Sequence, residues 1–191
     1  SPNNSKDFKV ASSKENINAD LVKVIIISQA GSEGLDFKNI RQVHILEPWY
    51  NMNRNEQIIG RAVRNCSHTK LPFSERNVEI YLHGSHYDDV ELLDLYLYRF
   101  SEKKAIKIGK VSRLLKEVSI DCQLNKEYNN LVIDKMEKLN ISSGKTIDYL
   151  IEDKPYSSTC DYMKSCQYKC GFDTSQLEIN LDTYDDYYIK V

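Results

Sequence analysis

The hydrophobic pattern in the first half of the chain predicts a small parallel sheet. Residues 22–28 (VKVIIIS) are β-branched and barely alternate, which is typical of a strand covered on both faces. Residues 42–46 and 78–82 are shorter apolar runs that predict two more strands. Residues 51–64 carry apolar side chains at helical spacing and predict a helix between those two strands. A strand, a helix and a strand in this order favour parallel pairing in an α/β domain.

The pattern in the second half of the chain is helical and then irregular. Apolar residues recur at three- and four-residue steps over residues 90–120, which predicts a helix, with a break at Gly109. A polar, helix-prone stretch continues to about Leu139, and a region rich in Cys and Tyr begins near Pro155. Residues 1–20 are polar and show no period, so we expect them to be a lead-in from a longer chain.

Composition narrows the class of protein without naming a function. The 191 residues are 41% hydrophobic and 28% charged, which is ordinary for a soluble globular domain. The net charge of -2 means that any nucleic-acid binding must come from a local patch. No apolar stretch is long enough to cross a bilayer and no signal peptide is visible, so we expect no membrane partner. Five cysteines, an odd number, argue against a disulfide framework and for a reducing intracellular compartment.

A loop with two glycines follows the first predicted strand. Residues 28–36 (SQAGSEGLD) leave the carboxyl end of that strand, where ligands bind in open α/β sheets. Gly31 and Gly34 allow close approach of the backbone to a phosphate or a sugar, and Asp36 supplies a carboxylate for a ribose or an arginine. Taken alone, such a loop is more often structural than functional.

The helix over residues 51–64 carries the most specific set of polar side chains. Gln57, Arg61 and Arg64 fall at i, i+4 and i+7, so a helix places them on one edge. Two guanidiniums one turn apart suit the charge that develops on a transferring γ-phosphoryl group. Gly60 costs helix stability, which favours close approach of another backbone or a ligand at that point. For the helix alone, two solvated surface arginines are an equally good interpretation.

The order of these segments resembles motifs V and VI of superfamily 2 helicases. The resemblance rests on residues 34–36 (GLD), 48–51 (PWYN) and 57–64 (QIIGRAVR), about twenty residues separating the two motifs. Residues 42–54, 64–68 and 72–78 narrow it to the helicase/NTPase family of nucleocytoplasmic large DNA viruses, which includes poxvirus nucleoside triphosphatase I and the small subunit of the early transcription factor. The resemblance extends over most of residues 22–170.

This resemblance implies a role for each matching residue. Arg61 and Arg64 would be arginine fingers, and Gln57 would contact the nucleotide or couple it to the cleft. Gly34, Asp36 and Gly60 would lie at the nucleotide, and Ser28 and Gly31 would touch nucleic-acid phosphates. The nucleotide would be ATP with Mg²⁺, held mainly by an N-terminal RecA-like lobe, because no Walker A or Walker B motif is present in this sequence. We therefore expect this part of the protein to be inactive alone.

The resemblance also implies an architecture and a setting. We expect an α/β fold, a RecA-like (P-loop NTPase-type) helicase C-terminal lobe with a parallel sheet that is incomplete at its N-terminus and carries a helical C-terminal extension. The expected partners are the N-terminal lobe, a DNA or RNA backbone and the viral transcription machinery, in the virion or the host cytoplasm. The expected segments are a polar lead-in at 1–20, the lobe at 20–88, the helical extension at 89–140 and a Cys/Tyr-rich region at 141–191.

One alternative function stays open, and one apparent nucleotide motif is set aside. A non-catalytic subunit that keeps the motor fold to bind nucleic acid or a polymerase is the main rival, although a scaffold has no need of paired arginines. Residues 143–146 (SGKT) mimic the end of a phosphate loop, but Leu139 stands where the leading glycine belongs and no buried strand precedes it. We interpret that segment as a coincidence.

Two further sets of residues suggest binding sites. Lys103, Lys107 and Lys110 form a basic stripe at helical spacing, which fits contacts along a nucleic-acid backbone, although a solvated helix face is the commoner interpretation. Three thiolates close in sequence are able to hold zinc, with Cys122 or a histidine as fourth ligand; here they are Cys160, Cys166 and Cys170. Buried or reduced free cysteines are the alternative.

Overall fold

The computed structural model describes residues 6–28 and 37–171, without the side chains of residues 132–134. The chain divides into two compact units. The first unit comprises Ser1–Lys107 and Ile133–Ile151, and the second comprises Ile108–Val132 and Glu152–Val191. Each unit is described by itself below.

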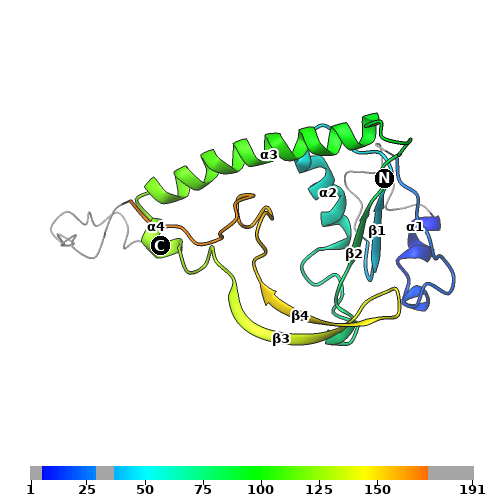
Figure 1. Ribbon diagram of the computed structural model, residues 1–191. Coiled ribbons are helices and arrows are strands. Elements are labelled where there is room, and N and C mark those ends of the chain that lie inside the picture. Colours follow the sequence, from blue (N-terminus) through cyan, green and yellow to red (C-terminus); the bar gives the residue numbers. More distant parts are fainter. Residues whose placement is uncertain (1–5, 29–36, 172–191) are drawn as a thin grey trace. The chain divides into compact units, whose positions relative to one another are not determined.

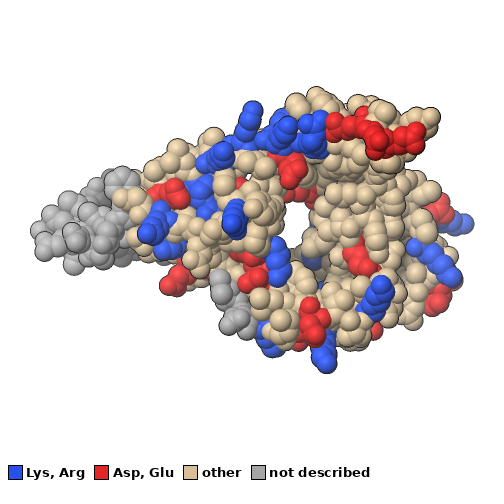
Figure 2. All heavy atoms as spheres, viewed as in Figure 1, with Lys and Arg blue, Asp and Glu red and all other residues tan. Residues whose placement is uncertain are grey.

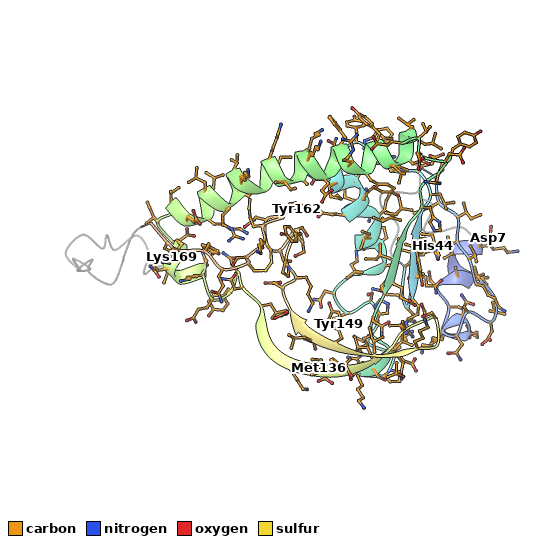
Figure 3. All side chains as sticks on the ribbon, in the orientation of Figure 1. Asp7, His44, Met136, Tyr149, Tyr162 and Lys169 are labelled. Carbon is orange, nitrogen blue, oxygen red and sulfur yellow. A yellow bond between two sulfur atoms is a disulfide. The ribbon has the colours of Figure 1, made fainter. Side chains whose placement is uncertain are left out.

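A two-stranded parallel sheet with one helix against it forms the centre of the first unit. Strand β1 (Gln42–Ile45) pairs with β2 (Glu79–Leu82), and helix α2 (Met52–Ala62) contacts β1 (Figure 1). The register sets His44, labelled in Figure 3, beside Tyr81. Their rings stack with centroids 4.6 Å apart. Ile45, on the opposite face of β1, is buried. The predicted parallel strands and the helix between them are confirmed.

The strand predicted over residues 22–28 is wrong for the described structure. This segment runs without strand pairing, and the side chains of Val24 and Ile26 are 75% and 91% exposed. A strand covered on both faces needs neighbours along its backbone and a layer over each face. The described residues supply neither for this segment, so its apolar side chains face solvent.

The side chain of Asn16 organises the polar segment at the start of the chain. This segment contains helix α1 (Lys6–Ala11) and the short 3₁₀ helix η2 (Lys14–Asn16). The Asn16 amide donates to the carbonyls of Ala11 and Val22 and accepts from the N–H groups of Leu21 and Val22, at 2.8–3.1 Å. Its side chain thus satisfies backbone groups that no ladder or helix pairs.

Helix α3 (Leu93–Val118) is continuous and contributes to both units. The break predicted at Gly109 is wrong. A Cβ on Gly109 would lie 2.0 Å from the carbonyl oxygen of Asp161, so the glycine provides room for a neighbouring backbone. No helix in the part of the chain that is described is long and apolar enough to span a membrane.

A β-hairpin replaces the end of the predicted helical extension. Strands β3 (Val132–Asn140) and β4 (Thr146–Glu152) pair with each other, so the helical interpretation of residues 119–140 is wrong apart from the single turn α4 (Cys122–Asn125). Gly144, with φ +83°, closes the turn between the strands. The short 3₁₀ helix η4 (Phe73–Glu75) completes the regular elements of the first unit.

The second unit is held by a buried ion network and two disulfides. Asp161, 5% exposed, accepts from Arg113 Nε at 2.8 Å and Lys116 Nζ at 2.7 Å. Arg113 also donates to three carbonyls of the loop, those of Cys160, Ser165 and Gln167. The sulfur pairs are Cys122–Cys170 and Cys160–Cys166. The loop that carries Tyr162 and Lys169 (Figure 3) is therefore tied to α3 and α4.

Candidate functional site

Helix α2 begins where the sequence predicts and exposes one polar edge. Asn51 is its N-cap residue, with an extended backbone. Ala62 and Asn55 are buried, Gln57 is exposed and Arg61 is half-buried. Gln57 and Arg61 lie one turn apart within the helix, as the motif requires. The structure therefore confirms this part of the predicted edge.

The structure corrects the placement of Arg64. The helix ends at Ala62, Val63 leaves the helical conformation with φ -92° and ψ 78°, and Arg64 lies exposed in the turn that follows. Periodicity placed Gln57, Arg61 and Arg64 on one helix edge, and for Arg64 this is wrong. The second arginine is presented by a loop, so its position depends on what holds that loop.

A serine and a histidine hold the loop that carries Arg64. The buried Ser67 Oγ contacts the Ala62 carbonyl at 3.1 Å and accepts from the Arg64 N–H at 3.3 Å. His68 contacts Ser67 Oγ through Nδ1 and the Ile40 carbonyl through Nε2, both at 2.7 Å. The Ser67 carbonyl accepts from the Asn39 N–H at 3.1 Å. The loop is thus fastened to the segment that leads into β1.

Sequence reasoning missed this pair of residues. His68 lies in the loop after the predicted arginine helix, and no period in the sequence gave it a partner. The one available signal was the short polar run after the helix, because Ser and Asn next to a helix end often bond to its last backbone groups. The tertiary contact with Ile40 has no sequence signal.

Gly60 has open space around it in the structure. An added Cβ would meet nothing within 4 Å among the described residues. Close approach by another described backbone is therefore not seen, and the nucleotide contact predicted for Gly60 stays a prediction.

Part of the predicted site falls outside the described residues. Gly31, Gly34 and Asp36 belong to residues 29–36, which the structure does not describe. Ser28 is described and its side chain is exposed. The roles predicted for these four residues stay predictions.

The predicted basic stripe lies on the surface of α3. Lys103, Lys107 and Lys110 are all exposed. In Figure 2 the Lys and Arg side chains gather along this helix, and acidic side chains gather at its N-terminal end. The stripe is therefore accessible, as a nucleic-acid contact requires.

The predicted zinc centre is wrong. Cys160 bonds to Cys166, and Cys170 bonds to Cys122, so none of the four sulfurs is a free thiolate. Within the described ranges, no group of three or more His, Cys, Asp or Glu residues is placed to hold a metal. The expectation that the cysteines form no disulfides is wrong as well, because spacing in the sequence does not determine pairing.

The segment that mimics a phosphate loop is a hairpin turn that binds a carboxylate. Glu79 of β2 accepts hydrogen bonds from the hydroxyls of Ser142 and Ser143 and from the Ser143 N–H. The Ser142 hydroxyl is the main cause that lowers the pKa of Glu79 to about 2. Residues 143–146 therefore have a structural role.

Comparison with known proteins relates the chain to helicases. Residues 7–66 match the family model of the helicase conserved C-terminal domain. The predicted kinship with helicases is confirmed. A protein of Acanthamoeba polyphaga mimivirus named as an ATP-dependent RNA helicase is 39% identical over 61% of this chain and 15% of its own length. A protein of Invertebrate iridescent virus 3 named as a helicase is 29% identical over 88% of this chain and 15% of its own length.

A third relative carries a different kind of name. The termination factor NPH-I homolog of African swine fever virus is 32% identical over 61% of this chain and 18% of its own length. These relatives belong to the viral helicase family that the motifs indicate. The chain thus spans less than a fifth of each of these three relatives. No solved structure matches the chain.

Proposed function

We propose that this chain is the C-terminal motor lobe of an ATP-dependent helicase or translocase, and that Arg61 and Arg64 reach the γ-phosphate of ATP held by an N-terminal RecA-like lobe. The observation that carries this proposal is the arrangement around the end of α2. Gln57 and Arg61 share an edge of the helix, and Arg64 follows on a loop that Ser67 and His68 fasten.

The chemistry of these groups suits phosphoryl transfer. The charge of the transferring group spreads over its oxygens, and positioned guanidiniums stabilise that charge more in the transition state than in bound ATP. Arg61, rooted in a helix, gives a fixed donor, whereas Arg64, on a short fastened loop, adjusts as the two lobes close. Gln57, Gly34 and Asp36 would contact the rest of the nucleotide, and Gly60 would leave room for it. Mg²⁺ would be held by the other lobe.

The relatives extend the proposal to substrates and partners. Their names include ATP-dependent RNA helicases and a termination factor homolog. We therefore take ATP as the nucleotide, DNA or RNA as the track, contacted by Ser28, Gly31 and the α3 lysines, and the viral transcription machinery as a partner, in the virion or host cytoplasm. The rival is a subunit that binds nucleic acid or a polymerase without hydrolysing ATP.

The test is the turnover of the full-length protein after Arg61→Ala. An arginine finger contributes about 10³- to 10⁵-fold to turnover, so kcat should fall by orders of magnitude while KM for ATP changes little. Arg61→Lys should restore only a small part, because lysine does not reproduce the planar guanidinium. Lys70→Ala, an exposed cation in the next turn, is the matched control and should keep wild-type turnover.

Gly60→Ala gives a second arm of the same assay. The structure leaves space for the methyl group, so the change should stabilise α2 by about 0.5–1 kcal/mol. A stabilised protein with reduced turnover would locate a ligand or a second lobe against Gly60. Unchanged turnover in Arg61→Ala would contradict the finger role, and an inactive wild-type protein would favour the non-catalytic subunit.

A further inference from the structure

One face of α3 within the first unit is made of aromatic and cationic side chains. At about 100° per residue, the residues of this face fall within an arc of about 140° centred opposite Ala105. The buried Ser101 and Ala105 lie away from the arc. No acidic residue falls inside it. Leu93, the first residue of the helix, also falls within the arc. The name α3 face is kept for the aromatic and cationic residues, which are Tyr96, Arg99, Phe100, Lys103, Lys104 and Lys107.

The aromatic side chains of the α3 face form a row. The rings of Tyr96 and Phe100 lie one turn apart, nearly parallel, with centroids 5.9 Å apart and an interplanar angle of 15°. They are 46% and 40% exposed, which leaves ring surface open to solvent. Tyr50, in the segment before α2, is 45% exposed. The ammonium of Lys104 lies over the rings of both Tyr50 and Phe100, so Tyr50 extends the row of aromatic rings.

Polar contacts fix this row in place. Lys104 Nζ donates to the side-chain oxygen of Asn51, the N-cap residue of α2. Arg99 lies over the Tyr96 ring at 5.5 Å and forms a bidentate pair with Glu91, at 2.6 and 2.8 Å. Rings held by such contacts lose little conformational entropy when a ligand stacks on them.

The cations of the α3 face form a second row beside the rings. Arg99, Lys103 and Lys107 are spaced at i, i+4 and i+8, so they follow one another along the helix. Lys103 and Lys107 are exposed. Arg99 is paired with Glu91, so among the described residues the unpaired positive charge of this row comes from Lys103 and Lys107, in a chain whose net charge is -2.

A row of open rings beside a row of cations matches the chemistry of a single nucleic-acid strand. Bases stack on aromatic side chains, and the phosphates of the same strand pair with lysines that follow the backbone. We propose that the α3 face binds single-stranded nucleic acid by stacking bases on Tyr96 and Phe100 while Lys103 and Lys107 contact phosphates. This proposal rests on the proposed function, which makes nucleic acid the track, and it adds base stacking at a surface outside motifs V and VI.

The experiment measures binding to two fluorescent probes of equal length and charge. One is a 20-nucleotide oligo-dT, and the other has abasic sites in place of its bases. The wild-type full-length protein should bind the abasic strand about a hundredfold more weakly, because two stacks are lost and each contributes about 1–3 kcal/mol. This comparison needs no variant, so it holds even where a substitution disturbs folding.

Variants assign the stacking to the two rings. Tyr96→Ala and Phe100→Ala should each weaken oligo-dT binding about tenfold and reduce the preference over the abasic strand. Tyr96→Phe and Phe100→Trp should preserve both. Tyr87→Ala, which removes an aromatic that is 67% exposed elsewhere on the first unit, is the matched control and should bind as wild type.

The salt dependence separates the cationic row from the aromatic row. Lys103→Gln and Lys107→Gln should each lower the slope of log affinity against log salt by about 0.7, whereas the ring variants should leave that slope unchanged. Equal binding of both probes by the wild type, or unchanged binding in both ring variants, would overturn the proposal. Such a result together with intact nucleic-acid-stimulated turnover would point to a protein partner on the α3 face. An inactive wild-type protein would instead contradict the proposed function.

Discussion

The interactions that stabilise the first unit internally differ from those that stabilise the second. The first unit pairs two short parallel strands and joins its hairpin turn to β2 through solvent-accessible hydrogen bonds of Glu79. The second has two disulfides and a carboxylate, Asp161, that is nearly excluded from solvent between two cations. The unit that carries the arginine motif therefore has no disulfide among its described residues, and its hairpin turn is joined by exchangeable hydrogen bonds. The other is cross-linked, and its stability depends on redox state and on one buried charge.

Breaking the Cys122–Cys170 disulfide should have the largest effect on the stability of the second unit relative to the first. Cys122→Ser opens a cross-link between residues 48 positions apart, and the chain-entropy model gives about 4 kcal/mol for a loop of that length. Cys160→Ser opens a loop of six positions and should cost about 2 kcal/mol. Urea unfolding, followed by hydrogen exchange in each unit, measures both. Equal losses in the two variants, or a loss spread evenly over both units, would contradict the comparison.

Neutralising the buried carboxylate should have the next largest effect. Asp161→Asn keeps a residue that tolerates the φ of +54° but leaves the Arg113 and Lys116 charges without a counter-ion, at a cost of about 3 kcal/mol. The loss should appear in the second unit by the same exchange measurement. Asp148→Asn, which changes an exposed carboxylate on β4, is the matched control and should be neutral. A similar stability for both variants would show that the network adds nothing.

A smaller, pH-dependent effect is expected in the first unit. The hydroxyl of Ser142 lowers the pKa of Glu79 from its ordinary value of 4.5 to about 2. Because the pKa is lower in the folded protein, the contribution is fully present above pH 4.5 and is lost as the pH falls from 4.5 through about 2. Thermal melting of Glu79→Gln against wild type should therefore differ most near neutral pH and converge in acid. A difference that grows in acid would have the wrong sign.

The spacing of apolar residues in the sequence predicted the two paired strands and the helix between them. The strands at Gln42–Ile45 and Glu79–Leu82 and the helix between them follow from apolar spacing, and the motif residues Gln57 and Arg61 follow from the helix. The α3 lysines are exposed, as the predicted basic stripe requires, but apolar residues of the same helix such as Ile108 and Val111 are exposed as well.

The errors arose where a tertiary contact decides the structure. The helix α2 ends at Ala62, whose carbonyl accepts from the hydroxyl of Ser67. The helical spacing in the sequence continues to Arg64, so spacing alone placed the helix end too late. Gly109 does not break α3. A glycine is needed there because the backbone of Asp161, in a loop distant in sequence, approaches closely. Cysteine spacing fixed neither the pairing nor the choice between zinc and disulfides. The hairpin had a local signal in the Ser-Ser-Gly-Lys turn, and a comparison with turn motifs would have found it.

The central claim is that Arg61 stabilises the transition state of phosphoryl transfer. The most direct measurement is the affinity of the full-length protein for MgADP with and without aluminium fluoride, which together mimic that transition state. In wild type the fluoride should tighten binding strongly, and in Arg61→Ala that gain should largely disappear while MgADP alone binds as before. An equal gain from fluoride in both proteins would contradict the account.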